Sequence, residues 1–318
     1  MPLPAHLWQC LMLLLLTLIS LSPLVQAWAE FSPWANLNQL WPKGVVSVCY
    51  ESAATQHKYE PLLRDAMFLW YAAGLPETFK LQSTSPDICA VGIYDTVTVY
   101  DTPRLYSTNI GMPPMVPNEG VALVQHKMFL STPADHPDYV ILANIAHEIG
   151  HVFGLVHEHQ DPALWRDFDG GEWVFKFNCE NLEDFDRVTR GMTREQIYGP
   201  EGVCVNYRAA LNVGFMAADF LPYPLGDVTG PRGKWPSMDQ VDWDSIMIYG
   251  STAGAKEGTN VLTKIDGTVF LGNLVPSSGD VAGIMEMYNS AFANDFEPFW
   301  NDPRSPHFYL FQQYSSCG

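Results

Sequence analysis

Four histidines lie close together in the segment HEIGHVFGLVHEH, residues 147–159. His147 and His151 are four positions apart, so on a helix their Cβ atoms lie on one face about 6 Å apart. Two neutral imidazoles at that separation can bind one tetrahedral metal ion at roughly 2.0–2.1 Å each. Glu148 lies about 100° around the helix axis from His147, beside the ligands rather than among them. A carboxylate in that position can take a proton from metal-bound water.

A third ligand depends on Gly154. A helix that continued past Phe153 would carry His157 away from the other two histidines, whereas a glycine turns the chain at little steric cost and brings His157 back. Three histidines leave a fourth coordination position for water, as in a catalytic rather than a closed structural zinc site. A histidine in a core is the simpler interpretation of the others, which are His57, His126, His136, His159 and His307.

The elements that position this segment are predicted from hydrophobic periodicity. Residues 45–51 and 90–100 are rich in β-branched and aromatic residues and predict strands, and the alternating residues 120–130 predict a third strand, an edge strand. Apolar residues at helical spacing predict helices over 59–74, 138–153 and 278–291. Strands that cluster early among interspersed helices favour an α+β fold over a doubly wound sheet.

The segment HEIGHVFGLVH resembles the H-E-x-x-H-x-x-G-x-x-H signature of metzincin zinc peptidases, and Glu158 after the third histidine resembles the astacin family within that group. Residues 40–50, 244–250 and 276–288 are similar to the opening strand, the Met-turn and the terminal helix of astacins. The resemblance implies a two-lobed catalytic domain over 40–291. It also implies a twisted, mostly parallel sheet with an antiparallel edge strand, an active-site helix and a C-terminal helix.

The resemblance also implies roles for single residues. Met247 would lie beneath the zinc, and Tyr249 would stabilise the oxyanion that forms during peptide hydrolysis. Ile248 stands where the family usually has a histidine, and Gln160 and Asp161 stand where the family commonly supplies a basic residue.

The function implied is a secreted zinc endopeptidase with one Zn²⁺ per chain, ligands His147, His151 and His157, and Glu148 as the base. Its partners would be protein or peptide substrates, and the strand at 120–130 would bind an extended peptide as a further antiparallel strand. The alternative is a secreted protein of the same fold that binds zinc without catalysing a reaction. The sequence does not predict the cleavage-site preference or the oligomeric state.

The first 27 residues contain no Lys, Arg, Asp or Glu and include an apolar run from Leu11 to Leu21, which predicts a secretory signal peptide ending at Ala27. An uncleaved membrane anchor is the alternative, although the run is short for a membrane span. The net charge of −18 therefore belongs wholly to the remaining chain. Such an acidic protein repels phosphate backbones and anionic membranes, so we expect neither nucleic acid nor a stable membrane association.

Five cysteines follow the predicted signal peptide, and secretion predicts two disulfides with one cysteine left over. Cys179 and Cys204 flank a Gly- and Pro-containing stretch and are the first expected pair. Cys49 and Cys89 then follow by elimination, which leaves Cys317 to couple two chains.

Three segments lie outside the resemblance or depart from it. Residues 28–39 form a short N-terminal segment, so we expect signal cleavage alone to give a nearly mature protein. Residues 161–239 are longer than usual in astacins and are interpreted as an elaboration of the lower half of the cleft, with a separate small domain as the alternative. Residues 292–318 form an aromatic and Pro-rich tail.

Overall fold

The computed structural model describes residues 40–91, 95–112, 125–165, 174–223 and 241–289. Its main sheet has five strands in the order β2-β1-β3-β5-β4. Strands β1 (Val45–Tyr50), β2 (Lys80–Ser83), β3 (Thr96–Asp101) and β5 (His126–Leu130) run parallel. Strand β4 (Ser107–Thr108) pairs antiparallel with β5 at one edge. The α+β class, with a mostly parallel sheet and an antiparallel edge strand, is thereby confirmed.

The main sheet differs from the strand predictions in three respects. The strand predicted over 120–130 is observed as β5, which lies inside the sheet and parallel to β3, so the edge strand is β4 instead. The strand predicted over 90–100 begins only at Thr96, because α3 (Pro86–Val91) occupies its first residues. Strand β2 was not predicted, since its sequence KLQS contains no β-branched or aromatic residue. Residues 92–94 and 120–124 lie outside the described part of the chain.

Three long helices correspond to the predicted ones. Helix α4 (Asp138–Val152) and helix α8 (Ser278–Asn289) begin at the predicted residues and end within two residues of the predicted ends. Helix α2 (Ala53–Ala72) begins six residues earlier than predicted, because the Ser52 side chain accepts a hydrogen bond from the Thr55 amide and caps the helix there. Beyond its end, Gly74 has φ +110°.

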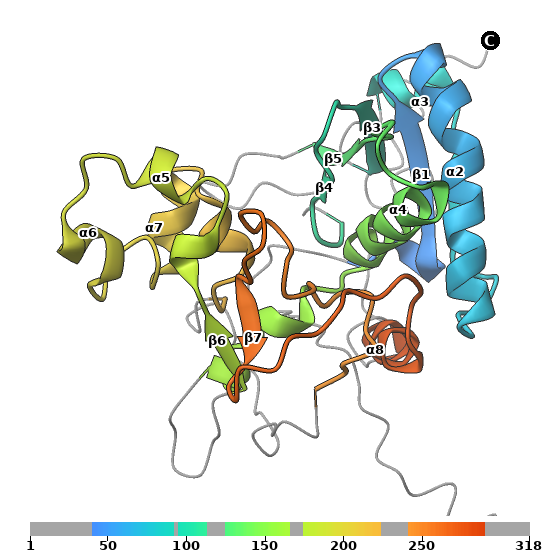
Figure 1. Ribbon diagram of the computed structural model, residues 1–318. Helices are drawn as coiled ribbons and strands as arrows, with labels where there is room; N and C mark the ends of the chain where they lie inside the picture. The colour runs from blue at the N-terminus through green and yellow to red at the C-terminus, as the bar shows by residue number, and fades with distance from the viewer. Residues whose placement is uncertain (1–39, 92–94, 113–124, 166–173, 224–240, 290–318) are drawn as a thin grey trace, which may run out of the picture.

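Helices α2 and α4 lie side by side against the main sheet (Figure 1). The indole of the fully buried Trp70 on α2 donates a hydrogen bond to the Ala146 carbonyl of α4 at 3.0 Å. Similarly, the Trp41 indole donates to the Val152 carbonyl at 2.8 Å. These side chains belong to one continuous hydrophobic core formed by the sheet, α2, α4 and α8. The two tryptophans therefore fix α4 at Ala146 and at Val152, on either side of the stretch that carries His147 and His151.

A second hydrophobic core contains residues from two parts of the chain, 164–221 and 241–262. It packs around the two-stranded sheet of β6 (Phe175–Phe177) and β7 (Leu262–Lys264), which pair antiparallel. The short helices are η1 (Pro42–Gly44), η2 (Glu158–Gln160), η3 (Pro162–Trp165), η4 (Cys179–Asn181), α5 (Phe185–Val188), α6 (Arg194–Tyr198), α7 (Tyr207–Asn212) and η5 (Met216–Asp219). The longer segment at 161–239 therefore shares a core with residues that follow it, as far as it is described.

The predicted disulfides are both present: Cys49 is joined to Cys89 and Cys179 to Cys204, each with a Cα–Cα distance of 5.7 Å. Residues 1–39 and 290–318, with the predicted signal peptide, the tail and Cys317, lie outside the described residues. Within the described ranges, no helix combines the length and apolar character needed to span a bilayer.

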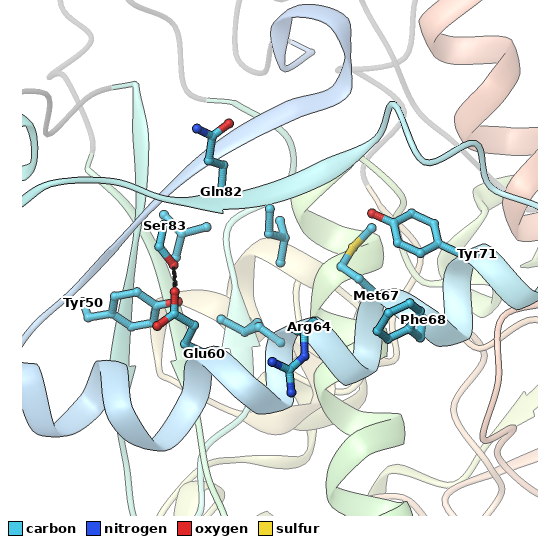
Figure 2. Close-up of a pocket in the computed structure, with 11 residues that line it drawn as sticks. Tyr50, Glu60, Arg64, Met67, Phe68, Tyr71, Gln82 and Ser83 are labelled. Atoms are coloured by element: carbon cyan, nitrogen blue, oxygen red, sulfur yellow. Dashed lines mark hydrogen bonds between the residues drawn. The ribbon is translucent and has the colours of Figure 1, made fainter.

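A groove of about 480 Å³ lies between α2 and β2 (Figure 2). Apolar side chains such as Met67 and Phe68 form one part of it, and Tyr50, Glu60 and Ser83 form a polar end. The Ser83 hydroxyl donates to Glu60 at 2.5 Å, so the polar end is already hydrogen-bonded internally. None of the four histidines of residues 147–159 lines this groove.

Candidate metal centre

Helix α4 is held against the Met-turn by a close approach at Gly150. A Cβ atom at this position would lie 2.5 Å from the Met247 sulfur and 3.2 Å from the Trp70 ring. Met247 is fully buried, so the space is filled on all sides. A glycine between the first two histidines therefore lets the Met247 side chain lie directly against helix α4.

The chain turns at Gly154, which has φ +106°, a conformation that side chains disfavour. The turn ends the helix with two backbone hydrogen bonds, from Gly154 to the His151 carbonyl at 2.9 Å and from Leu155 to the Gly150 carbonyl at 3.0 Å. His157 then follows in extended conformation. This is the reversal that the spacing of the histidines predicts.

The three predicted ligand nitrogens converge on one point. The Nε2 atom of His157 lies 3.2 Å from that of His147 and 3.1 Å from that of His151. Three nitrogens bound to one tetrahedral zinc at 2.0–2.1 Å would be separated by roughly 3.3 Å. Among the described residues, these three histidines are the one group of His, Cys, Asp or Glu whose ligand atoms lie close enough together to hold a metal ion.

The other ring nitrogen of each histidine contacts an oxygen that can only accept a hydrogen bond. The Nδ1 atom of His147 lies 2.8 Å from the Ile246 carbonyl, and that of His151 lies 2.9 Å from the Leu155 carbonyl. The Nδ1 atom of His157 lies 2.7 Å from the side-chain oxygen of Gln160. Each Nδ1 must therefore carry the proton, and each Nε2 presents a lone pair.

This arrangement fits a bound cation. Three lone pairs that face one another at 3.1–3.2 Å repel unless a positive charge lies between them. Burial lowers the pKa of His147 to about 4 and that of His151 to about 3, and it lowers the pKa of His157 as well. The rings are therefore neutral at pH 7, which is the form that ligates metal. The donor set, three imidazole nitrogens without a carboxylate, suits zinc.

Glu148 lies beside the triad with 4% of its surface exposed. Its Oε2 atom is buried and has no hydrogen-bond partner among the described residues. Burial raises the Glu148 pKa to about 8, and the negative charge of Asp219 adds to the effect. A cation bound next to Glu148 would act in the opposite direction and favour the carboxylate.

Tyr249 packs against the triad from the Met-turn. Its ring lies 4.3 Å from the His157 ring and 5.7 Å from the His147 ring, measured between centroids. Burial raises the pKa of its hydroxyl well above the ordinary value, with the charges of Asp219 and Glu148 adding to the effect. The phenol therefore stays protonated at neutral pH and is available as a hydrogen-bond donor.

His159 is next to the site without being part of the ligand set. Its Nε2 atom lies 2.8 Å from the Asp219 carbonyl, and its Nδ1 atom accepts a hydrogen bond from the Tyr249 amide at 3.4 Å. Its ring stacks on that of His157 at 5.2 Å. Both nitrogens are thus engaged with the second core, which agrees with the interpretation of His159 as a core histidine.

The Met-turn is held by Asp280, a residue of α8 that the sequence did not single out. One carboxylate oxygen accepts from the Ser245 hydroxyl at 2.6 Å, and the other accepts from the Ile246 amide at 2.9 Å. The Ile246 carbonyl in turn accepts the proton of His147 Nδ1. The only sequence signal is the pair Ser277 and Asp280 at the start of the helix, where the Ser277 hydroxyl accepts from the Asp280 amide at 2.9 Å.

Glu158 joins the residues after the triad to the Met-turn and to Asp242, which precedes that turn. Its amide donates to the Met247 carbonyl at 3.1 Å, and its Oε1 accepts from the Asp242 amide at 3.1 Å. Glu158 is 4% exposed. The glutamate that resembles the astacin signature is therefore a buried connection between distant segments. Ile248, the departure from the family histidine, packs in the second hydrophobic core.

Comparison with known proteins gives structural likenesses only. No protein-family model matches the chain, and no curated protein matches it. Among solved structures, high choriolytic enzyme 1, a hatching enzyme zinc-protease from the medaka fish Oryzias latipes, superimposes with a TM-score of 0.48 at 16% identity, over 83% of this chain and 99% of that chain. Myroilysin superimposes with a TM-score of 0.40 at 18% identity, over 79% and 96%. At these TM-scores and identities the likenesses support no inference about function. An inference about function rests on the geometry of the site instead.

Proposed function

We propose that the chain is a secreted zinc-dependent endopeptidase of the astacin type. The observation that carries the proposal is the set of three Nδ1-protonated histidines whose Nε2 lone pairs converge within 3.2 Å, with a buried carboxylate beside them. A closed structural site would use a fourth protein ligand, and the described residues supply none at this point. The two hydrophobic cores correspond to the two lobes of the domain.

His147, His151 and His157 would hold the zinc, which supplies Lewis-acid polarisation of a peptide carbonyl and makes water more acidic. Glu148 takes a proton from the attacking water as the oxygen adds to the carbonyl carbon, and it returns that proton to the leaving amine as the C–N bond breaks. The Tyr249 hydroxyl donates a hydrogen bond to the oxyanion that forms in between. No nucleophilic side chain takes part.

Secretion is part of the proposal and is supported by the two disulfides, which persist in oxidising compartments. Mass spectrometry of the secreted protein should find a mature chain that begins close to residue 28. A start well beyond Leu40 would show that a further segment is removed.

Glu148→Gln tests the mechanism, because it removes the base and keeps the size of the side chain. Zinc content should stay near one per chain, and turnover of a casein or peptide-library substrate should fall by several orders of magnitude. Glu257→Gln is the matched control, since Glu257 is exposed on a turn of the second lobe. Its activity should equal that of the wild type. Substantial activity in Glu148→Gln would contradict the mechanism.

The second candidate is a secreted protein that binds zinc without catalysis. The wild type would then bind one zinc and cleave nothing, with or without a chelator. The buried and unpaired Oε2 atom of Glu148 favours the peptidase, because a carboxylate kept buried without a full set of hydrogen bonds costs stability.

A further inference from the structure

Gln160 is a buried amide three residues after the third histidine, with 2% of its surface exposed. Its Oε1 atom lies 2.7 Å from His157 Nδ1. Its Nε2 atom donates to two backbone carbonyls, those of Ala218 and Leu221, at 2.8 Å each. The Gln160 amide is therefore hydrogen-bonded on both sides, through its oxygen to His157 and through its nitrogen to the segment 218–221.

The two carbonyls fix the orientation of the amide. A carbonyl only accepts hydrogen bonds, so the nitrogen of Gln160 must face Ala218 and Leu221, and its oxygen must face His157. An amide oxygen only accepts, so His157 must carry its proton on Nδ1. The Nε2 lone pair of His157 then points at the other two ligands. The tautomer of this ligand is thus set from outside the triad.

His157 differs from the other two ligands in this respect. His147 and His151 donate to backbone carbonyls, of Ile246 and Leu155, which belong to the Met-turn and to the glycine turn. His157 lies beyond the helix, where no helical hydrogen bond holds its backbone in register with α4. A side chain, Gln160, holds its ring instead.

The segment that holds Gln160 is itself firmly packed. Ala218 and Leu221 are buried in the second core, at 6% and 4% exposure. The same stretch is tied back by His159 Nε2, at 2.8 Å from the Asp219 carbonyl, and by the Tyr223 amide, which donates to the Gln160 carbonyl at 3.1 Å. The amide of Gln160 therefore has a fixed support on the side away from the metal centre.

We propose that Gln160 is a positioning residue of the metal centre, which holds His157 in the metal-binding tautomer and orientation through its amide oxygen. The inference rests on the proposed function in taking the triad as a zinc site. It does not depend on whether the protein cleaves peptides. Outer partners of ligand histidines fix ring orientation and raise ligand basicity, and their loss costs about 10–100-fold in metal affinity.

Two substitutions separate the contact to His157 from the contact to the segment 218–221. Gln160→Met has a similar length but neither accepts from His157 nor donates to the carbonyls. Gln160→Glu keeps an acceptor for His157 and loses the donors. Both variants should lower the melting temperature of the metal-free protein. Zinc should bind about 10–100-fold more weakly to Gln160→Met, and within about threefold of the wild type to Gln160→Glu.

Gln196→Met is the matched control. Gln196 also makes a side-chain hydrogen bond in the second lobe, accepting from the Thr193 amide at 2.8 Å, and it touches no ligand. This variant should lose stability without a change in zinc affinity. Affinity is measured by chelator competition, and the visible spectrum of the Co²⁺-substituted protein reports whether the ligand geometry changes.

Equal zinc affinity in Gln160→Met and the wild type would overturn the proposal, and so would an equal loss in Gln160→Met and Gln160→Glu. If Gln160→Met does not fold, the wild-type protein still provides a test of the inference. Nitrogen NMR of its metal-free form should show His157 protonated on Nδ1, and protonation on Nε2 would refute the inference. Stoichiometric zinc without peptide cleavage would refute the proposed function alone and leave this inference in place.

Discussion

Replacing Asp280 should destabilise the protein and the metal centre together, because this carboxylate holds the Met-turn from α8. It is fully buried and accepts from the Ser245 hydroxyl, the Ile246 amide and the Ser277 amide. Asp280→Ala leaves these donors without an acceptor, and each buried, unsatisfied donor costs about 1–3 kcal/mol. Release of the buried carboxylate offsets part of this cost. We expect a net loss of roughly 2–4 kcal/mol in the free energy of unfolding.

Asp280→Asn should cost less than Asp280→Ala. The amide oxygen can accept from the two backbone amides, while its nitrogen faces the Ser245 hydroxyl, which can accept. The pH dependence provides a second test. Burial raises the Asp280 pKa from 3.8 to about 6, so its protonated form is favoured in the folded state. The stability that protonation of Asp280 contributes is therefore fully present below pH 3.8 and is lost as the pH rises through 6.

A pKa difference from 3.8 to about 6 corresponds to on the order of 3 kcal/mol. Because Asn does not titrate, the stability of the wild type relative to Asp280→Asn should fall by up to that amount between pH 4 and pH 7.

The assay is equilibrium urea denaturation of the metal-free protein at several pH values, followed by zinc titration of each variant. The Ile246 carbonyl that holds His147 belongs to the turn that Asp280 supports, so zinc should bind more weakly to Asp280→Ala. Asp87→Ala is the control, since Asp87 also lies in the first turn of a helix but is exposed, and it should change stability by less than about 0.5 kcal/mol. A loss below 1 kcal/mol in Asp280→Ala, or the opposite pH trend for Asp280→Asn, would refute the reasoning.

Three further predictions concern the site itself. Tyr249→Phe should lower kcat by about 10²–10³ with little change in KM and unchanged zinc content, and an unchanged kcat would exclude the oxyanion role. His151→Ala should lose zinc at low nanomolar free metal, because both nitrogens of His159 are already engaged; metal analysis that still finds one zinc per chain would show that another residue binds it. Gly150→Ala should cost about 1–2 kcal/mol in denaturation experiments, since overpacking against Met247 exceeds the gain of about 1 kcal/mol in helix propensity; a stabilised variant would contradict the contact.

The sequence by itself determined the features of the metal centre that are local. The spacing of His147, His151 and His157 around Gly154 places three imidazoles together through helix geometry and one backbone turn, neither of which depends on distant residues. The long helices were predictable for the same reason, since their apolar periodicity is a property of the segment itself. The start of α2 was missed because the position of the first helical residue depends on one hydrogen bond, from the Thr55 amide to the Ser52 side chain.

The tertiary structure decided which acceptors orient the ligands and how the strands pair. The Ile246 carbonyl lies 99 positions from His147, and Asp280 lies 34 positions from Ile246, so no local pattern connects them. Strand 126–130 could equally have been an edge strand by its alternation, and only its pairing with both β3 and β4 placed it inside the sheet. Pairing and second contacts form between segments that are far apart in sequence, and their geometry depends on how the whole core packs. For that reason the contact between the Gln160 amide and His157 appears only in the folded chain, whereas in the sequence Gln160 was a departure from a family pattern.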